Sequence, residues 1–292
     1  MINRILCILL LCLAFSQNLK CVEETNYKFL LERMFVIPKW VENKPTISIN
    51  YGYSIPSIPL KHFTSNFSHP YPIELSYGFT RFEFGEEFGL ENIQYYASEF
   101  VHIANISSHL KPKSLNKDIT TDNWTFGFAY KNGYGHIFAD SSSLTFYHTG
   151  SLDWSHIDIE LAAATEKEQT EFNKFDEKMK FGTSFESGLM YNLTDILNLN
   201  VSYFHNLTFQ DAHLGKWLGS SFIELILQRT LDFWSYEIIK NNTDYGPLLN
   251  FIGKSACSVI IYELRRNKQF FPFNSNYALS YDGIKFGFVF TF

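Results

Sequence analysis

Hydrophobic and polar residues alternate with a period of two along much of this chain, most clearly at its end. From Gly283 to Phe292, large apolar side chains fall on one face of an extended backbone: Ile284, Phe286, Phe288, Phe290 and Phe292. The other face carries residues that are mostly smaller or polar: Lys285, Gly287, Val289 and Thr291. A period of two residues is the pattern of a β-strand whose faces meet different surroundings. The end of the chain therefore predicts such a strand.

The same alternation recurs upstream, in residues 47–53, 73–79, 124–130 and 157–161. Small or polar residues stand between the apolar ones, which suits the crowded interior of a barrel. In the last of these segments, we expect Ile157 and Ile159 to face outward and Asp158 and Glu160 to face inward.

Short turns separate several of the predicted strands. A hairpin is expected from residues 180–193 and 197–206, joined at Thr194-Asp195-Ile196. Further tight turns are expected at residues 150–153 and 282–283. Counting the segments predicts a barrel of about ten to twelve strands. The number is approximate because each strand of a barrel has a weak sequence pattern.

Composition supports a membrane barrel. Aromatic residues make up 18% of the chain, with 30 Phe and 17 Tyr, although the mean hydropathy is only -0.11. A barrel wall with one face in lipid and the other in a polar lumen accounts for both values. We therefore predict an all-β fold, a transmembrane antiparallel β-barrel. A soluble secreted β-sandwich or ligand-binding barrel with a Phe-rich core is the alternative.

The N-terminus has the features of a secretory signal peptide. Met1 to Arg4 is short and basic, and residues 5–15 are apolar. Small residues at 14 and 16 predict cleavage after Ser16. We expect residues 1–16 to be the signal peptide, 17–45 a periplasmic extension and 46–292 the barrel. In an oxidising compartment Cys21 and Cys257 could pair, and the sequence leaves this open.

The final strand resembles the C-terminal signal of bacterial outer-membrane proteins, which is aromatic at alternate positions and ends in Phe. The resemblance covers only the residues quoted above and identifies a transport class, with no specific family. It implies the outer membrane of a Gram-negative cell, among outer-membrane lipid and lipopolysaccharide. It also implies that Ile284, Phe286, Phe288, Phe290 and Phe292 are a membrane-assembly signal read by the barrel-assembly machinery.

Residues 213–266 interrupt the period of two. Apolar residues between Leu214 and Ile239 recur at helical spacing, and Gly246-Pro247 then breaks the pattern. Three structures remain open: two irregular strands, a helix that lies at the membrane interface or caps the barrel, and a plug inside the lumen. A helix here would favour an occluded or lipid-engaged barrel over an open pore.

Charged residues on the predicted inner faces are the candidates for the lumen lining: Glu74, Asp158, Glu160, Glu186 and Lys285. Side chains fill the interior of a small barrel, and a network of mixed charge is one way to fill it. The alternative is a weakly cation-selective conduit.

Catalytic and metal-binding motifs are not evident. Outer-membrane lipid hydrolases place a His two residues before a Ser on one strand, and this chain lacks that motif. His205 should face outward while Ser202 and Glu186 face inward, so these groups should not meet. No His or Cys spacing predicts a metal site, no cofactor is expected, and a net charge of -6 argues against nucleic acid. We expect a structural, binding or small-solute transport role, with a lipid or lipopolysaccharide acyl hydrolase as the alternative; the oligomeric state stays open.

Overall fold

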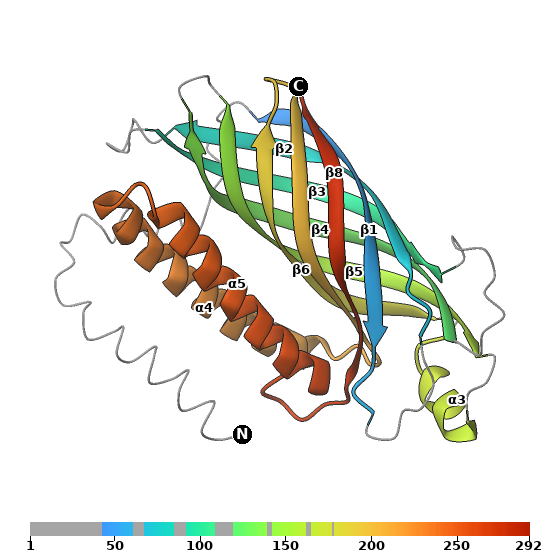
Figure 1. The fold of residues 1–292 in the computed structure, drawn as a ribbon. Coiled ribbons are helices and arrows are strands. Elements are labelled where there is room, and N and C mark those ends of the chain that lie inside the picture. The colour runs from blue at the N-terminus through green and yellow to red at the C-terminus, as the bar shows by residue number, and fades with distance from the viewer. Residues whose placement is uncertain are drawn as a thin grey trace. The chain divides into compact units, whose positions relative to one another are not determined.

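The computed structural model describes residues 43–60, 67–84, 92–108, 119–138, 142–161, 165–176 and 178–292. Within these residues, eight antiparallel strands form a closed barrel in which each strand pairs with its neighbours in the sequence (Figure 1). The strands are β1 (Lys44–Ser57), β2 (Tyr71–Phe84), β3 (Ile93–Ser107), β4 (Ile119–Ile137), β5 (Ser143–Leu161), β6 (Met179–Asn192), β7 (Leu197–Phe209) and β8 (Ala278–Thr291). The predicted all-β antiparallel barrel is confirmed.

The period of two becomes an inside and an outside of the barrel. On β1, Ile49 and Tyr51 are about half exposed, whereas Ser48 and Asn50 are buried in the interior. The last strand closes the barrel, because β8 pairs with both β7 and β1. Its Phe288 lies opposite Ile49 of β1 and Leu199 of β7, so apolar residues of all three strands share the outer surface.

The prediction of ten to twelve strands is wrong for the described part of the chain, which has eight. The strands are longer than expected, and β4 and β5 have 19 residues each. The turns predicted at 150–153 and 282–283 lie inside β5 and β8. Gly and Asp are common in turns, but here Gly150 and Asp282 occupy outward-facing positions within paired strands.

The connections between strands differ at the two ends of the barrel. At one end lie the longer ones, β1 to β2, β3 to β4, β5 to β6 and β7 to β8. The predicted turn between β6 and β7 is confirmed at the opposite end. There the backbone N–H groups of Leu193 and Thr194 donate to the carbonyl oxygen of Leu197, at 2.9 and 3.1 Å.

A short helix, α3 (Glu166–Phe172), contributes to the apolar core at the long-loop end. Its first turn is a capping box, in which Thr165 and Glu168 bond each other's backbone N–H groups. Phe172 at the end of the helix and the nearby Phe175 are fully buried in one cluster with Ile157 of β5.

The segment that lacked strand periodicity forms two antiparallel helices, α4 (Leu214–Asn241) and α5 (Gly246–Asn267). Pro247 stands in the first turn of α5, where its missing N–H costs no hydrogen bond. This helical hairpin lies against the outside of the barrel wall (Figure 1), with α5 packed on strands β4 to β8. The prediction of a helix is therefore confirmed, but the hairpin lies along the outside of the wall and does not cap the barrel. The two-strand and lumen-plug alternatives are wrong.

The signal peptide, most of the N-terminal extension and Cys21 fall outside the described residues, so these predictions and a Cys21–Cys257 disulfide stay predictions. Among the helices that the structure describes, none has the length and apolar content needed to cross a membrane.

Candidate functional site

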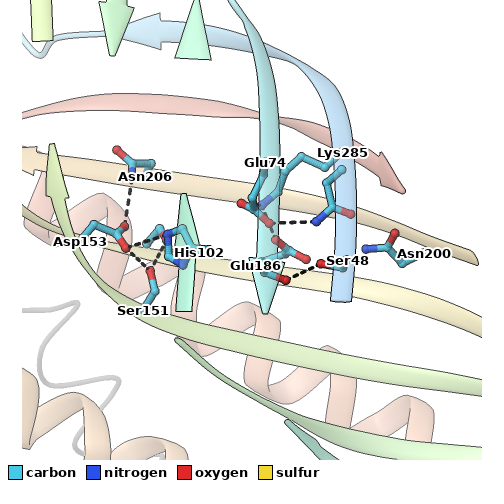
Figure 2. Close-up of polar contacts among 12 residues, drawn as sticks. Ser48, Glu74, His102, Ser151, Asp153, Glu186, Asn200, Asn206 and Lys285 are labelled. Carbon is cyan, nitrogen blue, oxygen red and sulfur yellow. Dashed lines mark hydrogen bonds and ion pairs between the residues drawn. The ribbon is translucent and has the colours of Figure 1, made fainter. Parts of the chain in front are cut away.

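The middle of the lumen holds an ionic cluster formed by three strands. The ammonium of Lys285 on β8 lies 2.8 Å from Glu74 Oε2 on β2 and 2.6 Å from Glu186 Oε2 on β6 (Figure 2). The side chains are 8%, 13% and 9% exposed, respectively. A buried charge is tolerated only when it is paired and hydrogen-bonded, and this arrangement pairs one cation with two carboxylates.

Neighbouring side chains complete the cluster. Lys131 Nζ lies 4.0 Å from Glu186 Oε1 and 4.3 Å from the ring centroid of Tyr147. The Tyr147 hydroxyl donates to Glu186 Oε1 at 2.8 Å, and Asn50 Nδ2 donates to Glu74 Oε1 at 2.9 Å. Two ammonium groups thus face two carboxylates, so the cluster carries no net formal charge.

A second polar cluster surrounds Asp153 of β5, whose side chain is fully buried. His102 Nε2 lies 3.3 Å from Asp153 Oδ1, and the Ser151 hydroxyl donates to the same oxygen at 2.8 Å. Asn206 Nδ2 donates to the other oxygen at 3.1 Å (Figure 2). A serine nucleophile needs an imidazole to take its proton. Here the serine donates to the carboxylate instead, so the cluster has a structural arrangement.

These two clusters leave little space inside the barrel. The cavity that they line has a volume of about 40 Å³, which is room for ordered water and no larger solute. Eight strands make a barrel just wide enough for side chains to fill. Over this section the lumen is therefore filled by side chains, and Glu74, Glu186 and Lys285 all belong to the filling.

Asp158 and Glu160, also expected in the lumen, do not line it. Their side chains point outward on β5, where Asp158 is 56% exposed and lies 3.4 Å from His156. The inner positions belong instead to Ile157 and Ile159, which are buried in the apolar core at the long-loop end. The interior changes from polar to apolar along β5, and the alternation alone cannot say which face is which.

Several polar residues of the outer wall lie where the hairpin covers it. Lys254 of α5 donates to Asn132 Oδ1 at 3.0 Å. Ser258 Oγ lies 2.7 Å from His148 Nε2, and Ser255 Oγ donates to the Ser187 hydroxyl at 2.9 Å. Each of these contacts joins an outward-facing strand residue to the helix.

The hairpin has the reverse polarity of a water-soluble helix pair. Polar groups predominate on the buried face of α5: Asn250, Lys254, Ser258, Tyr262 and Arg265. Its exposed face is mostly apolar, including Leu248, Leu249, Ile252, Val259 and Ile260. In a surface helix of a soluble protein, the apolar stripe faces the core. The sequence signal of this face is a polar residue at every fourth position from 250 to 262, which the apolar spacing alone does not show.

Helix α4 packs mainly on α5. Between them, Arg265 Nη1 lies 2.6 Å from Glu224 Oε2, and Lys254 Nζ lies 2.8 Å from Asp232 Oδ1. Gln228 Nε2 also donates to the Ser258 hydroxyl, at 2.7 Å. Ion pairs and hydrogen bonds thus hold α4 to α5, while the outward side of α4 exposes large apolar residues.

A large cavity separates α4 from the barrel wall. Its volume is about 1020 Å³. One side is formed by α4 residues such as Leu218, Phe222 and Leu225, and the other by wall residues such as Phe79 and Phe128. This volume is at the upper end of the range of about 300–1,000 Å³ for small-molecule sites. No sequence pattern predicts this cavity, because the strands and helices that line it are far apart in the chain.

The Ser258–His148 contact does not form a hydrolytic site. Ser258 is 1% exposed and also accepts a hydrogen bond from Gln228. Among the residues that the structure describes, no carboxylate forms an ion pair or hydrogen bond with His148 that could orient its ring. Across the described ranges, no group of three or more His, Cys, Asp or Glu side chains is arranged to hold a metal ion.

Comparisons with known proteins find similar folds and no close relative. No protein-family model matches the chain, and no curated protein matches it in sequence. Neisserial surface protein A is 10% identical, with a TM-score of 0.37, and the match covers 85% of this chain and 97% of that one.

Two further solved structures are similar at the same level. Ail, the attachment invasion locus protein of Yersinia pestis, is 12% identical with a TM-score of 0.33, covering 86% of this chain and 100% of that one. Outer membrane protein OprG of Pseudomonas aeruginosa is 10% identical with a TM-score of 0.32, covering 86% and 97%. These likenesses identify neither a family nor a function for this chain.

Proposed function

We propose that this chain is an outer-membrane β-barrel with a structural or binding role, and that its lumen does not conduct solutes. The filled lumen is the observation that carries the proposal. A pore needs a continuous water path, whereas Lys285, Glu74 and Glu186 meet across the interior and leave about 40 Å³ beside them.

The outer surface supports a location in lipid. Large apolar side chains are exposed around the wall, among them Tyr77 on β2, Phe126 on β4 and Phe286 on β8. A continuous apolar band flanked by aromatic residues is typical of barrels that cross a membrane. Where Asn132, His148 and Ser187 interrupt the apolar wall, α5 covers them and presents its own apolar face outward.

The ends of the barrel suggest its orientation. Outer-membrane barrels have short periplasmic turns and longer extracellular loops. By that rule the end with α3 faces the outside of the cell, and the end with the β6–β7 turn faces the periplasm. The barrel-assembly machinery would then read the outer face of β8 as its signal, with outer-membrane lipid and lipopolysaccharide as the surroundings.

Single-channel recording tests the closed lumen. Purified protein is reconstituted into a planar bilayer, with an open porin in the same bilayer as the control for detection. We expect the porin to give stepwise conductance and this protein to give none above the baseline. Stable conductance steps from this protein would contradict the proposal and favour small-solute transport.

A further inference from the structure

We propose that the cavity between α4 and the barrel wall holds the acyl chain of one membrane lipid. This inference deepens the binding role proposed above and rests on the location in a membrane. Four features carry it: the apolar lining, the pairing of the charges around it, the position of the cavity within the exposed apolar surface, and an open position on its floor.

The lining suits an alkyl chain. The wall side carries Tyr77, Phe79 and Val101, and the helix side carries Leu218 and Phe222. Because the chain would enter from lipid and not from water, van der Waals contact with this lining holds it, and a chain of methylene groups can bend to fill an irregular space. A volume of about 1020 Å³ is large enough for a ligand of lipid size.

The cations around the cavity already have partners. Arg265 pairs with Glu224 at 2.6 Å, Lys254 pairs with Asp232 at 2.8 Å, and Arg229 lies 3.8 Å from the same Asp232. An anionic ligand would have to displace these carboxylates. The part of the ligand that enters is therefore uncharged, which fits an acyl chain.

The cavity adjoins the surface that faces lipid. Tyr77, Phe79 and Phe128 on the wall, and Phe222 and Leu225 on α4, line the cavity and are also about half exposed. In a membrane these residues are surrounded by lipid chains. A chain can therefore enter sideways, between the helix and the wall, without crossing a polar layer.

Gly150 of β5 lines the cavity and gives a direct way to fill it. It faces outward between Tyr130 and Phe185, and a Cβ added there would meet no atom within 4 Å. A larger side chain at this position would extend into the proposed site from a Cβ that meets no neighbouring atom. Ile49 on β1 also faces outward and is half exposed, but it does not line the cavity, so it gives a matched control.

The experiment compares wild type, Gly150→Leu, Gly150→Trp and the control Ile49→Trp. Each protein is purified from membranes in a mild detergent and analysed by native mass spectrometry, before and after addition of 1-palmitoyl-2-oleoyl-phosphatidylcholine. We expect about one lipid per wild-type chain and per Ile49→Trp chain. Lipid retention should fall from wild type to Gly150→Leu and again to Gly150→Trp. In Gly150→Trp it should be one tenth of the wild-type value or less.

The outcomes separate this inference from the proposed function. Equal lipid retention by all four proteins overturns the inference, and so does a wild type that carries only detergent while still migrating as a folded barrel. If the chain does not behave as a membrane barrel at all, the proposed function fails first, and the inference fails with it. The mass of a co-purified lipid tells a phospholipid from lipopolysaccharide, and either source supports an acyl-chain site.

Discussion

Lys285 is the residue that balances the charge of two carboxylates in the interior of the barrel. Its ammonium is buried and shared between Glu74 and Glu186, which come from strands on different sides of the lumen. Removing one partner of a buried ion pair leaves an uncompensated charge, whereas replacing the whole group with apolar or neutral residues of similar size is often tolerated.

Substitution of Lys285 tests this dependence. We expect Lys285→Ala to lower the free energy of unfolding by about 3–5 kcal/mol, because two buried carboxylates lose their counterion. The variant that combines Glu74→Gln with Lys285→Met leaves Lys131 paired with Glu186, so it should recover most of that loss. Guanidinium unfolding in lipid vesicles, followed by tryptophan fluorescence, measures both. A single variant as stable as wild type would contradict the assignment, as would a double variant as unstable as the single one.

The inner positions of Glu74, Glu186 and Lys285 follow from the period of two, since each lies between outward-facing apolar residues. Asp158 and Glu160 satisfied the same rule and yet face outward. Their apolar neighbours Ile157 and Ile159 face inward, where they form one cluster with Phe172 and Phe175 from the connection between β5 and β6. A strand that alternates has two faces, and only its tertiary contacts decide which of them is buried.

The helical hairpin is an element whose polarity depends on its place against the barrel. Its polar face contacts polar residues of the outer wall, and its exposed face continues the apolar surface. Asn132 and His148 would otherwise be polar groups facing lipid, which is unfavourable without hydrogen bonds. The hairpin and the polar wall residues therefore depend on each other.

Lys254 is the contact that joins α4, α5 and the wall, through Asp232 and Asn132. We expect Lys254→Ala to weaken docking of the hairpin by about 1.5–3 kcal/mol, the usual contribution of a hydrogen bond to a charged group. Hydrogen exchange of α4 and α5 should quicken while the strands keep their protection. Lys240→Ala, at an exposed position on α4, is the control. Unchanged exchange in Lys254→Ala would show that the ion pair does not hold the hairpin.

The last strand closes the barrel and ends in the proposed assembly signal. Deletion of Phe292 should reduce the amount of assembled barrel in the outer membrane at least tenfold, because the machinery would no longer find the terminal aromatic residue. Ile103→Ala, at an exposed outward-facing position on β3 and outside the proposed signal, should assemble at nearly the wild-type level. Normal assembly after deletion of Phe292 would contradict the proposal that this strand is an assembly signal.

The hairpin could be predicted only in part. Helical spacing between Leu214 and Ile239 indicated a helix, and Gly246-Pro247 marked the break. Its place outside the barrel could not be predicted, because an inverted amphipathic helix has the same periodicity as an ordinary one. The outward-facing polar residues Asn132 and Ser187 mark the part of the wall where the hairpin docks. Their partners Lys254 and Ser255 are distant in the sequence, so the pairing could not be predicted.

At the scale of the whole molecule, the fold class was predictable and the strand count was not. Closure of the barrel follows from the alternation and from the pairing of β8 with β1. The count failed because turn-forming residues such as Gly150 and Asp282 also serve inside strands. The cavity beside α4 is a property of the assembled barrel and hairpin, so no local pattern could reveal it.

Location in the outer membrane as a folded barrel is the central claim, and one measurement tests it most directly. Cells that express the full chain are fractionated, and the samples are run on a denaturing gel with and without heating. We predict that the protein is in the outer-membrane fraction and that its mobility shifts on heating, because a closed barrel resists detergent until it is heated. Recovery in the soluble periplasmic fraction, with the same mobility in both lanes, would contradict the claim.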